Sequence, residues 1–396
     1  QLPTWIATGE TVDLMFPLLQ DLNTYVSQGL IEPLDSLIAE NAPAIQQLTQ
    51  EGFQITTNNM IDGETWAVSQ VPNVFGMGGS YLIRSEYVKE AGITHDPKKI
   101  YTLDELTDLF GKMKELHPDL YPCGVVSANR TASEFSYANG IYDPLGAKSF
   151  TGVLMGTDST QVVNLFETEE YRALCEQMKM WYDKGFMPQD MATSTMRGTE
   201  YMNAGRGFCT YASYGVREDY TDFGKMQSNS TGRNIGAKKI GDPYLTTDFA
   251  SAVLGIPSTS KAVNEAIQFL NIAYTDEYVY NTLLWGLEGR DYVKVTEDTV
   301  DYPEGLTADT VPYCAFMTMG EWGTESYMWG LEDGKTEEEK QANRDYALTV
   351  NKTIPKSPYY GFRFDGSDVK NEITALTNVF EQYAYPLMCG SVDVDS

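Results

Sequence analysis

The sequence predicts an α/β protein organised in two lobes. Segments with helical periodicity alternate with short extended runs along the 396 residues, and this alternation favours an α/β architecture with mostly parallel sheets. At about 150 residues per domain, the length indicates two or three domains. No low-complexity linker and no internal repeat is visible, so we expect the chain to cross between the lobes more than once.

The first predicted helix begins at a capping box, in which Thr102 accepts from a backbone N–H and Glu105 reaches back. Leu106, Phe110 and Met113 follow at positions i, i+4 and i+7, which places them on one apolar face. Further helices are predicted to start near Thr168, Ser260, Thr275, Thr336 and Ser367. Glycines typical of helix ends follow at positions 185, 286 and 390. The last helix is expected to bury a stripe of Val369, Ile373, Leu376, Phe380 and Tyr383.

Extended segments are predicted between these helices, where short apolar runs are bounded by Gly, Pro or polar residues. They span residues 12–16, 65–68, 81–83, 124–126, 207–210 and 252–256.

The charge balance excludes several classes of partner. The chain has 28 Lys and Arg against 56 Asp and Glu, a net charge of −28. Nucleic-acid binding requires a basic surface, and an anionic membrane would repel this chain. No apolar run approaches the roughly 18 residues that a membrane-spanning helix needs. A hydrophobic content of 42% argues against disorder.

Residues for catalysis, metals or cofactors form no recognisable motif. His95 and His117 are interpreted as solvated loop residues, and the five cysteines lie far apart, as free buried thiols or with one disulfide among them. The glycine-rich run 76–79 does not match a dinucleotide fingerprint, and residues 365–368 lack the alternating ligands of a calcium loop. We therefore predict no metal and no cofactor. A hydrolase stays an alternative, because two carboxylates about 5–9.5 Å apart would suffice.

Aromatic residues are unusually abundant, with 26 Tyr, 16 Phe and 6 Trp. Many fall in loop-like contexts and away from core stripes. Aromatic rings cover the apolar C–H faces of a sugar, while planar polar groups bond its hydroxyls, so this supply favours a carbohydrate ligand.

Several segments together resemble the extracellular solute-binding proteins of bacterial ABC importers. Residues 7–16 are similar to that family's "ASGE-x-P-D" segment, and residues 29–35 to its "G-L-L-x-P-L-D" stretch. Further similarity runs through residues 62–68, 84–92, 101–106, 181–185 and 203–207. Residues 285–292 and 359–365 resemble a lipoprotein subgroup of the family.

The resemblance implies a two-lobed periplasmic-binding-protein-like fold with a multi-stranded hinge and a ligand cleft between the lobes. Lobe 1 is expected to comprise residues 1–82 and 252–310, and lobe 2 residues 83–251 and 311–396. Family members have a strand–helix–strand unit before the matched segment and further helices after it, so the chain is expected to be short at both ends. The implied location is extracytoplasmic, in the periplasm or on the cell surface through an N-terminal lipid anchor.

The resemblance also implies ligand-binding positions. They include the loop after the first strand, the loop after residues 125–126, aromatics after residue 210 and residues near a lobe crossing. An arginine among them would clamp a carboxylate if the ligand is acidic, or form an ion pair if it is not. The predicted set is Phe16, Gln20, Asp21, Gln70, Asn129, Arg130, Tyr142, Tyr211, Tyr214, Trp285, Trp322, Tyr360 and Arg363.

The sequence therefore predicts a non-enzymatic protein that captures a small solute, most simply a carbohydrate or oligosaccharide, and delivers it to ABC permease subunits. A secreted carbohydrate-active hydrolase and a binding protein for peptides or other small polar metabolites remain alternatives.

Overall fold

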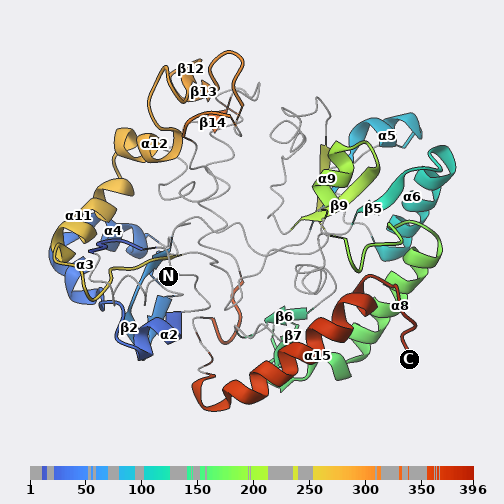
Figure 1. Ribbon diagram of the computed structural model, residues 1–396, viewed down its shortest axis with the longest axis horizontal. Helices are drawn as coiled ribbons and strands as arrows, with labels where there is room; N and C mark the ends of the chain where they lie inside the picture. Colours follow the sequence, from blue (N-terminus) through green and yellow to red (C-terminus); the bar gives the residue numbers. More distant parts are fainter. Residues whose placement is uncertain are drawn as a thin grey trace. The chain divides into compact units, whose positions relative to one another are not determined.

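A computed structural model describes most of the chain (Figure 1). The described residues are 11–15, 22–51, 55–56, 59–69, 80–93, 102–124, 141–143, 145, 152–156, 158–194, 196, 198–212, 235–239, 253–307, 310–313, 330–331, 338, 355–360, 362, 364 and 366–396.

The chain divides into two compact units, each assembled from separate segments. Unit 1 comprises Gln1–Val74, Thr247–Thr353 and Tyr360–Arg363, and unit 2 comprises Phe75–Thr246, Ile354–Tyr359 and Phe364–Ser396. The chain thus passes from one unit to the other several times. The lobe boundaries expected from the sequence stay a prediction.

Unit 1 combines five helices with short strands among its described residues. The helices are α2 (Leu22–Ser27), α3 (Asp35–Asn41), α4 (Pro43–Gln50), α11 (Val263–Ala273) and α12 (Glu277–Trp285). The strands are β1 (Met60–Ile61), β2 (Glu64–Thr65), β3 (Val68–Ser69), β11 (Val253–Leu254), β12 (Val293–Lys294), β13 (Thr299–Asp301) and β14 (Gly330–Leu331). β1 pairs with β2, β3 with β11 and β12 with β13, all antiparallel, whereas β13 and β14 are parallel.

Side-chain hydrogen bonds connect segments of unit 1 that are far apart in the sequence. Asn271 of α11 accepts from the backbone N–H groups of Ala44 and Ile45, at 2.8 and 3.2 Å, and so caps the start of α4. Asp35 at the start of α3 accepts from the Thr65 N–H at 2.7 Å. These bonds satisfy backbone donors that burial would otherwise leave unpaired.

Unit 2 contains a four-stranded sheet of order β10-β4-β9-β5, made of β4 (Ser80–Arg84), β5 (Tyr121–Gly124), β9 (Gly207–Ala212) and β10 (Ile235–Lys239). A second sheet joins β6 (Ile141–Asp143), β7 (Val153–Met155) and β8 (Val162–Val163). The helices are α5 (Ser85–Glu90), α6 (Leu103–Leu116), η3 (Leu165–Glu167), α8 (Glu169–Asp183), α9 (Gly198–Asn203), η4 (Ser367–Val369) and α15 (Lys370–Met388).

The expectation of mostly parallel sheets is wrong for the described strands. Only β5–β9 and β13–β14 are parallel; the other described pairings are antiparallel. A parallel pair needs a long crossover, and α8 and α9 supply it between β5 and β9. Each of the other described strand pairs joins two strands that run in opposite directions.

Two of the predicted helix starts are confirmed in detail. Thr102 caps α6 by accepting from the Glu105 N–H at 3.2 Å, while Glu105 accepts from the Thr102 N–H at 3.0 Å. Thr168 caps α8 by accepting from the Tyr171 N–H at 3.2 Å. Gly185 follows α8 with φ +68°, the left-handed conformation that glycine adopts without a steric cost.

Two other helices start later than predicted. The Oγ of Ser260 bonds Asp13 at 2.7 Å and the Ala262 N–H at 3.1 Å, so it closes a turn before α11 begins at Val263. Thr275 donates back to the Asn271 carbonyl of α11, and the cap of α12 is Asp276, which accepts from the Val279 N–H at 2.8 Å. The predicted start near Thr336 lies outside the described residues.

The last helix was predicted with the wrong buried face. Among the stripe residues, Phe380 is buried, but Leu376 and Tyr383 of α15 are 42% and 55% exposed. Phe380, Ala384 and Met388 form the buried face instead. The sequence of α15 is apolar over a wide arc, and packing against α8 covers only part of it.

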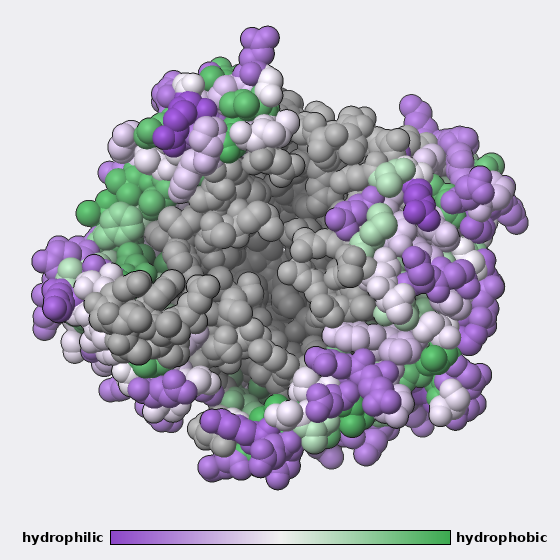
Figure 2. All heavy atoms as spheres, in the orientation of Figure 1, coloured by the Kyte–Doolittle hydropathy of each residue, from purple (hydrophilic) through white to green (hydrophobic). Residues whose placement is uncertain are grey.

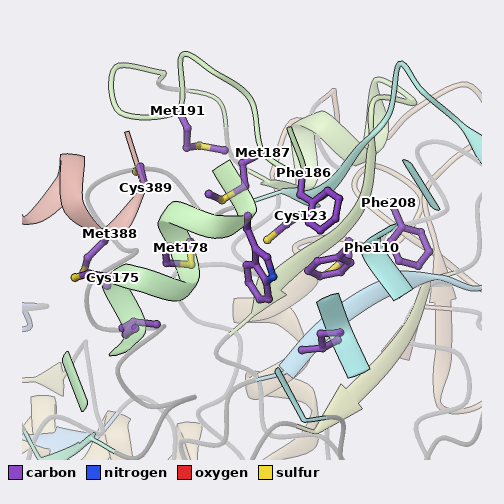
Figure 3. Packing of buried hydrophobic residues seen from close by; sticks show 14 of the residues in the cluster. Phe110, Cys123, Cys175, Met178, Phe186, Met187, Met191, Phe208, Met388 and Cys389 are labelled. Atoms are coloured by element: carbon purple, nitrogen blue, oxygen red, sulfur yellow. The ribbon is translucent and has the colours of Figure 1, made fainter. Parts of the chain in front are cut away.

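The core of unit 2 is rich in sulfur and aromatic side chains, several of which Figure 3 shows close together. Phe110 lies 5.1 Å from Trp181 between ring centroids, 6.1 Å from Phe186 and 6.4 Å from Phe208, all as edge contacts. Edge-to-face contacts of this kind stabilise a core beyond the burial of area. The Trp181 indole N–H donates to Thr107 Oγ1 at 2.8 Å, which satisfies its polar atom.

Candidate ligand-binding residues

Most of the predicted ligand-binding residues lie outside the described part of the chain. These are Phe16, Gln20, Asp21, Gln70, Asn129, Arg130, Tyr214, Trp322 and Arg363. Tyr142 and Tyr211 lie in described strands. Tyr142 is the central residue of β6, and Tyr211 of β9 is in register with Tyr81 of β4. The roles of all these residues stay predictions.

Trp285 lies in the interior of unit 1. It is the last residue of α12, is 2% exposed and belongs to the hydrophobic cluster that contains Tyr274, Tyr280 and Tyr292. In this structure its indole is a core side chain, and its proposed contact with a ligand stays untested.

The loop after Trp285 is held by a buried carboxylate that sequence reasoning did not single out. Asp291 is 1% exposed; its Oδ2 accepts from the Leu287 N–H at 2.8 Å, and Arg290 donates to the same carboxylate at 2.6–3.0 Å. The hydrogen bond from Arg290 is the main reason that the pKa of Asp291 is lowered. Gly286 has φ +86°, and a Cβ there would clash with Asp291 Oδ2, so only glycine fits.

A short aromatic segment precedes α15 and includes Tyr360, which was predicted from the sequence. Ser357 is 4% exposed, and its Oγ accepts from the Tyr359 N–H at 3.2 Å. The Tyr359 hydroxyl donates to the Thr160 carbonyl at 3.1 Å. Tyr360 is half-buried, and burial raises its pKa. Phe364, by contrast, is 47% exposed.

Titratable clusters are sparse in the described residues. No group of three His, Cys, Asp or Glu side chains in those residues is arranged to hold a metal ion. His117 contacts Glu90 at 3.1 Å between Nε2 and Oε2, an exposed pair, whereas His95 lies outside the described residues. Cys123, Cys175, Cys209 and Cys389 are free and buried.

No helix in the described part of the chain is long and apolar enough to cross a membrane.

Comparison with known proteins relates the whole chain to substrate-binding proteins. It is 25% identical over 401 aligned positions, which cover 98% of this chain and 74% of the relative, to a carbohydrate ABC transporter substrate-binding protein from Streptococcus pneumoniae. Residues 358–396 match a family model described as a domain of unknown function, DUF3502.

Solved structures share the fold. The N-glycan transport solute-binding protein NgtS of Streptococcus pneumoniae is 21% identical with a TM-score of 0.78, covering 100% of this chain and 82% of NgtS. NgtS has also been solved with Man5GlcNAc, with a TM-score of 0.69. The alginate-binding protein AlgQ2 is 16% identical with a TM-score of 0.59, covering 99% of this chain and 82% of AlgQ2.

These comparisons confirm two predictions from the sequence. The fold is the α/β fold of two-lobed periplasmic solute-binding proteins, and the resemblance to the substrate-binding proteins of ABC transporters extends along almost the entire chain.

Proposed function

We propose that this protein is the extracytoplasmic substrate-binding protein of an ABC importer and that it captures an oligosaccharide. The observation that carries this proposal is the similarity to a carbohydrate ABC transporter substrate-binding protein over 98% of the chain. Neighbours in fold include proteins solved with Man1GlcNAc, Man5GlcNAc and cycloalternan, all of them carbohydrates.

The composition supports a neutral, ring-shaped solute. An acidic chain with a net charge of −28 repels anionic solutes at long range, whereas a neutral sugar is indifferent to that field. The abundant tyrosines of the protein each combine a flat apolar face with a hydroxyl group. This combination suits a molecule with C–H faces and hydroxyl edges.

The proposed mechanism is binding and delivery without chemistry. A solute that binds one conformation better than another shifts the population toward that conformation, and the permease would recognise the loaded state. Permease subunits are the proposed partners, and a lipid anchor at the membrane surface is the proposed attachment. The predicted ligand-binding residues, above all those at positions 16–21 and 129–130, remain the candidates for the contacts.

A thermal-shift screen tests this function. The panel contains Man5GlcNAc, maltose, maltopentaose, single amino acids and a tripeptide. A sugar at a hundredfold excess over its Kd stabilises the native state by about 2.7 kcal/mol, which raises the melting temperature by several degrees. We expect a shift with at least one oligosaccharide and none with the amino acids or the peptide.

Two results would contradict the proposal. A shift with the peptide alone would favour a peptide-binding protein. Release of shorter sugars from the bound oligosaccharide at a catalytic rate, followed by chromatography, would identify a hydrolase.

A further inference from the structure

Two aromatic side chains in the region matched by DUF3502 are exposed. Tyr359 is 37% exposed and Phe364 is 47% exposed. Phe110 and Phe208 in the core of the same unit are both 0% exposed. Leaving large aromatic rings in water forgoes the free energy that burial would supply, so two exposed rings, one of them anchored, point to an interaction surface.

Tyr359 is anchored through its hydroxyl and its backbone. The hydroxyl donates to the Thr160 carbonyl at 3.1 Å, and the backbone N–H donates to the buried Ser357 Oγ at 3.2 Å. These two bonds fix the direction of the ring, because they restrain both ends of the residue. The ring is therefore positioned before any solute arrives.

Phe364 lies beside Gly366, shortly before α15. A Cβ at Gly366 would lie 3.5 Å from Phe364 Cε1 and would clash with Ile373, so the Phe364 ring and the Ile373 side chain lie on the same side of this glycine. Almost half of the Phe364 side chain is accessible. A side chain larger than that of glycine at position 366 would have to displace Ile373.

Exposed aromatic rings of this kind suit the apolar face of a sugar. Pyranose rings have C–H groups on their faces, and a rigid aromatic ring contacts them with little loss of rotamer entropy on binding. Neither ring adds a charge, which agrees with a neutral solute. The two residues are five positions apart in the sequence, so their Cα atoms lie at most about 18 Å apart, a span that an oligosaccharide can cover.

We infer that Tyr359 and Phe364 are carbohydrate-contacting residues that stack on pyranose rings, and that this is a role of the region matched by DUF3502. The inference rests on the proposed function and makes it more specific, because it names residues and a mode of contact.

Isothermal titration with Man5GlcNAc, or with the oligosaccharide that gives the largest shift in the screen, tests the inference. The variants are Tyr359→Leu and Phe364→Leu, which keep apolar bulk but remove the flat face. We expect each to raise the Kd at least tenfold, equivalent to about 1.4 kcal/mol. Phe364→Tyr retains a ring and should stay within threefold of the wild-type Kd.

Matched controls come from unit 1. Tyr278 of α12 is 71% exposed and Phe269 of α11 is 38% exposed. Figure 2 shows apolar side chains on the surface in the area where Figure 1 draws these two helices. Tyr278→Leu and Phe269→Leu should leave the Kd within twofold of the wild-type value. Wild-type affinity in both Tyr359→Leu and Phe364→Leu would overturn the inference and leave the proposed function intact.

A second measurement uses the wild-type chain, so it does not depend on how any variant folds. Hydroxyl-radical labelling with mass spectrometry should show at least twofold protection of Tyr359 and Phe364 by the bound oligosaccharide, and none of Tyr278 and Phe269. Equal labelling with and without the sugar, while titration detects binding, would overturn the inference. If the wild-type chain binds no sugar in the panel, the proposed function fails, and this inference fails with it.

Discussion

The cores of the two units are built from different side chains. The main core of unit 2 contains four cysteines and the methionines Met113, Met178, Met187, Met191 and Met388. The described core clusters of unit 1 contain one sulfur side chain, Met15, and are instead aliphatic with Tyr and Trp.

Hydrogen bonds between buried or part-buried groups accompany the core of unit 1. In unit 1, the buried Tyr274 hydroxyl donates to the Ser69 carbonyl, Asn59 Nδ2 donates to Ser69 Oγ at 3.1 Å, and Tyr313 donates to the Leu283 carbonyl at 2.6 Å. Unit 1 therefore depends on paired polar groups, which are costly to disrupt singly. Unit 2 depends more on polarisable side chains that fill irregular space.

The largest loss of stability is expected from a substitution in the aromatic core of unit 2. Phe110→Ala removes a fully buried ring from the contacts with Trp181, Phe186 and Phe208 and should lower the unfolding free energy of unit 2 by about 3–5 kcal/mol. Urea unfolding followed by Trp fluorescence measures it. Leu116→Ala on the same helix, where Leu116 is 49% exposed, should change it by less than about 0.5 kcal/mol. Similar losses in both variants would contradict this picture of the core.

The thiols of unit 2 should be protected as long as the unit is folded. Burial raises the pKa of Cys175 to about 11 and that of Cys389 to about 12, and it also raises the pKa values of Cys123 and Cys209. Because the thiolate is the reactive form, iodoacetamide at pH 8 should label these cysteines roughly a hundredfold more slowly in the native protein than in urea. Peptide mass spectrometry follows each site separately. Rapid labelling of native Cys175 would show that α8 opens without global unfolding.

Substitution of Asp291 tests how much a buried carboxylate contributes to the stability of unit 1. Asp291→Ala leaves the Leu287 N–H without its acceptor and should cost about 1–3 kcal/mol in the unfolding free energy of unit 1. Because the folded pKa lies below the ordinary value of 3.8, the contribution is present above that value and is lost as the pH falls through the folded pKa. Unfolding measured between about pH 5 and pH 2 should show a shallower acid loss in Asp291→Asn than in the wild type. An identical acid profile would mean that the carboxylate does not contribute.

Removal of a helix cap should give the smallest loss of stability, and the loss should be similar in the two units. Asp276→Ala in unit 1 and Thr168→Ala in unit 2 each remove an acceptor for one backbone N–H, so each should cost about 1 kcal/mol. Denaturant titration of the two variants compares them directly. Thr374→Ala inside α15, where the hydroxyl bonds only the Lys370 carbonyl of its own helix, should be close to neutral. A cost well above 2 kcal/mol at either cap would indicate a role beyond capping.

Local signals were reliable where they depend on a few neighbouring residues. The capping box at Thr102 and Glu105, the cap at Thr168 and the stop at Gly185 were all predicted correctly. Each is decided by hydrogen bonds or backbone angles within one turn of the helix, and such contacts can be read from the order of residues. The strand at residues 81–83 lies within β4, and the strand at residues 207–210 lies within β9.

Predictions were wrong where a contact with a segment remote in the sequence decided the local structure. Ser260 resembles a helix cap, but its hydroxyl bonds Asp13, which lies 247 residues away in the sequence. The burial of Trp285 in the core of unit 1 also depends on remote segments, and its predicted contact with a ligand stays a prediction. The wide apolar arc of α15 did not reveal which of its sides packs against α8.

The sequence by itself determined the α/β class, the resemblance to substrate-binding proteins, which rests on matched segments, and those helix ends that are set by local caps. Composition, periodicity and caps are properties of neighbours along the chain, so they need no knowledge of the fold. Only the tertiary structure decided which apolar faces are buried, that most described strands pair antiparallel, and that Tyr359 is anchored yet exposed. Burial is a property of what packs against a side chain, and those partners come from segments that are remote in the sequence.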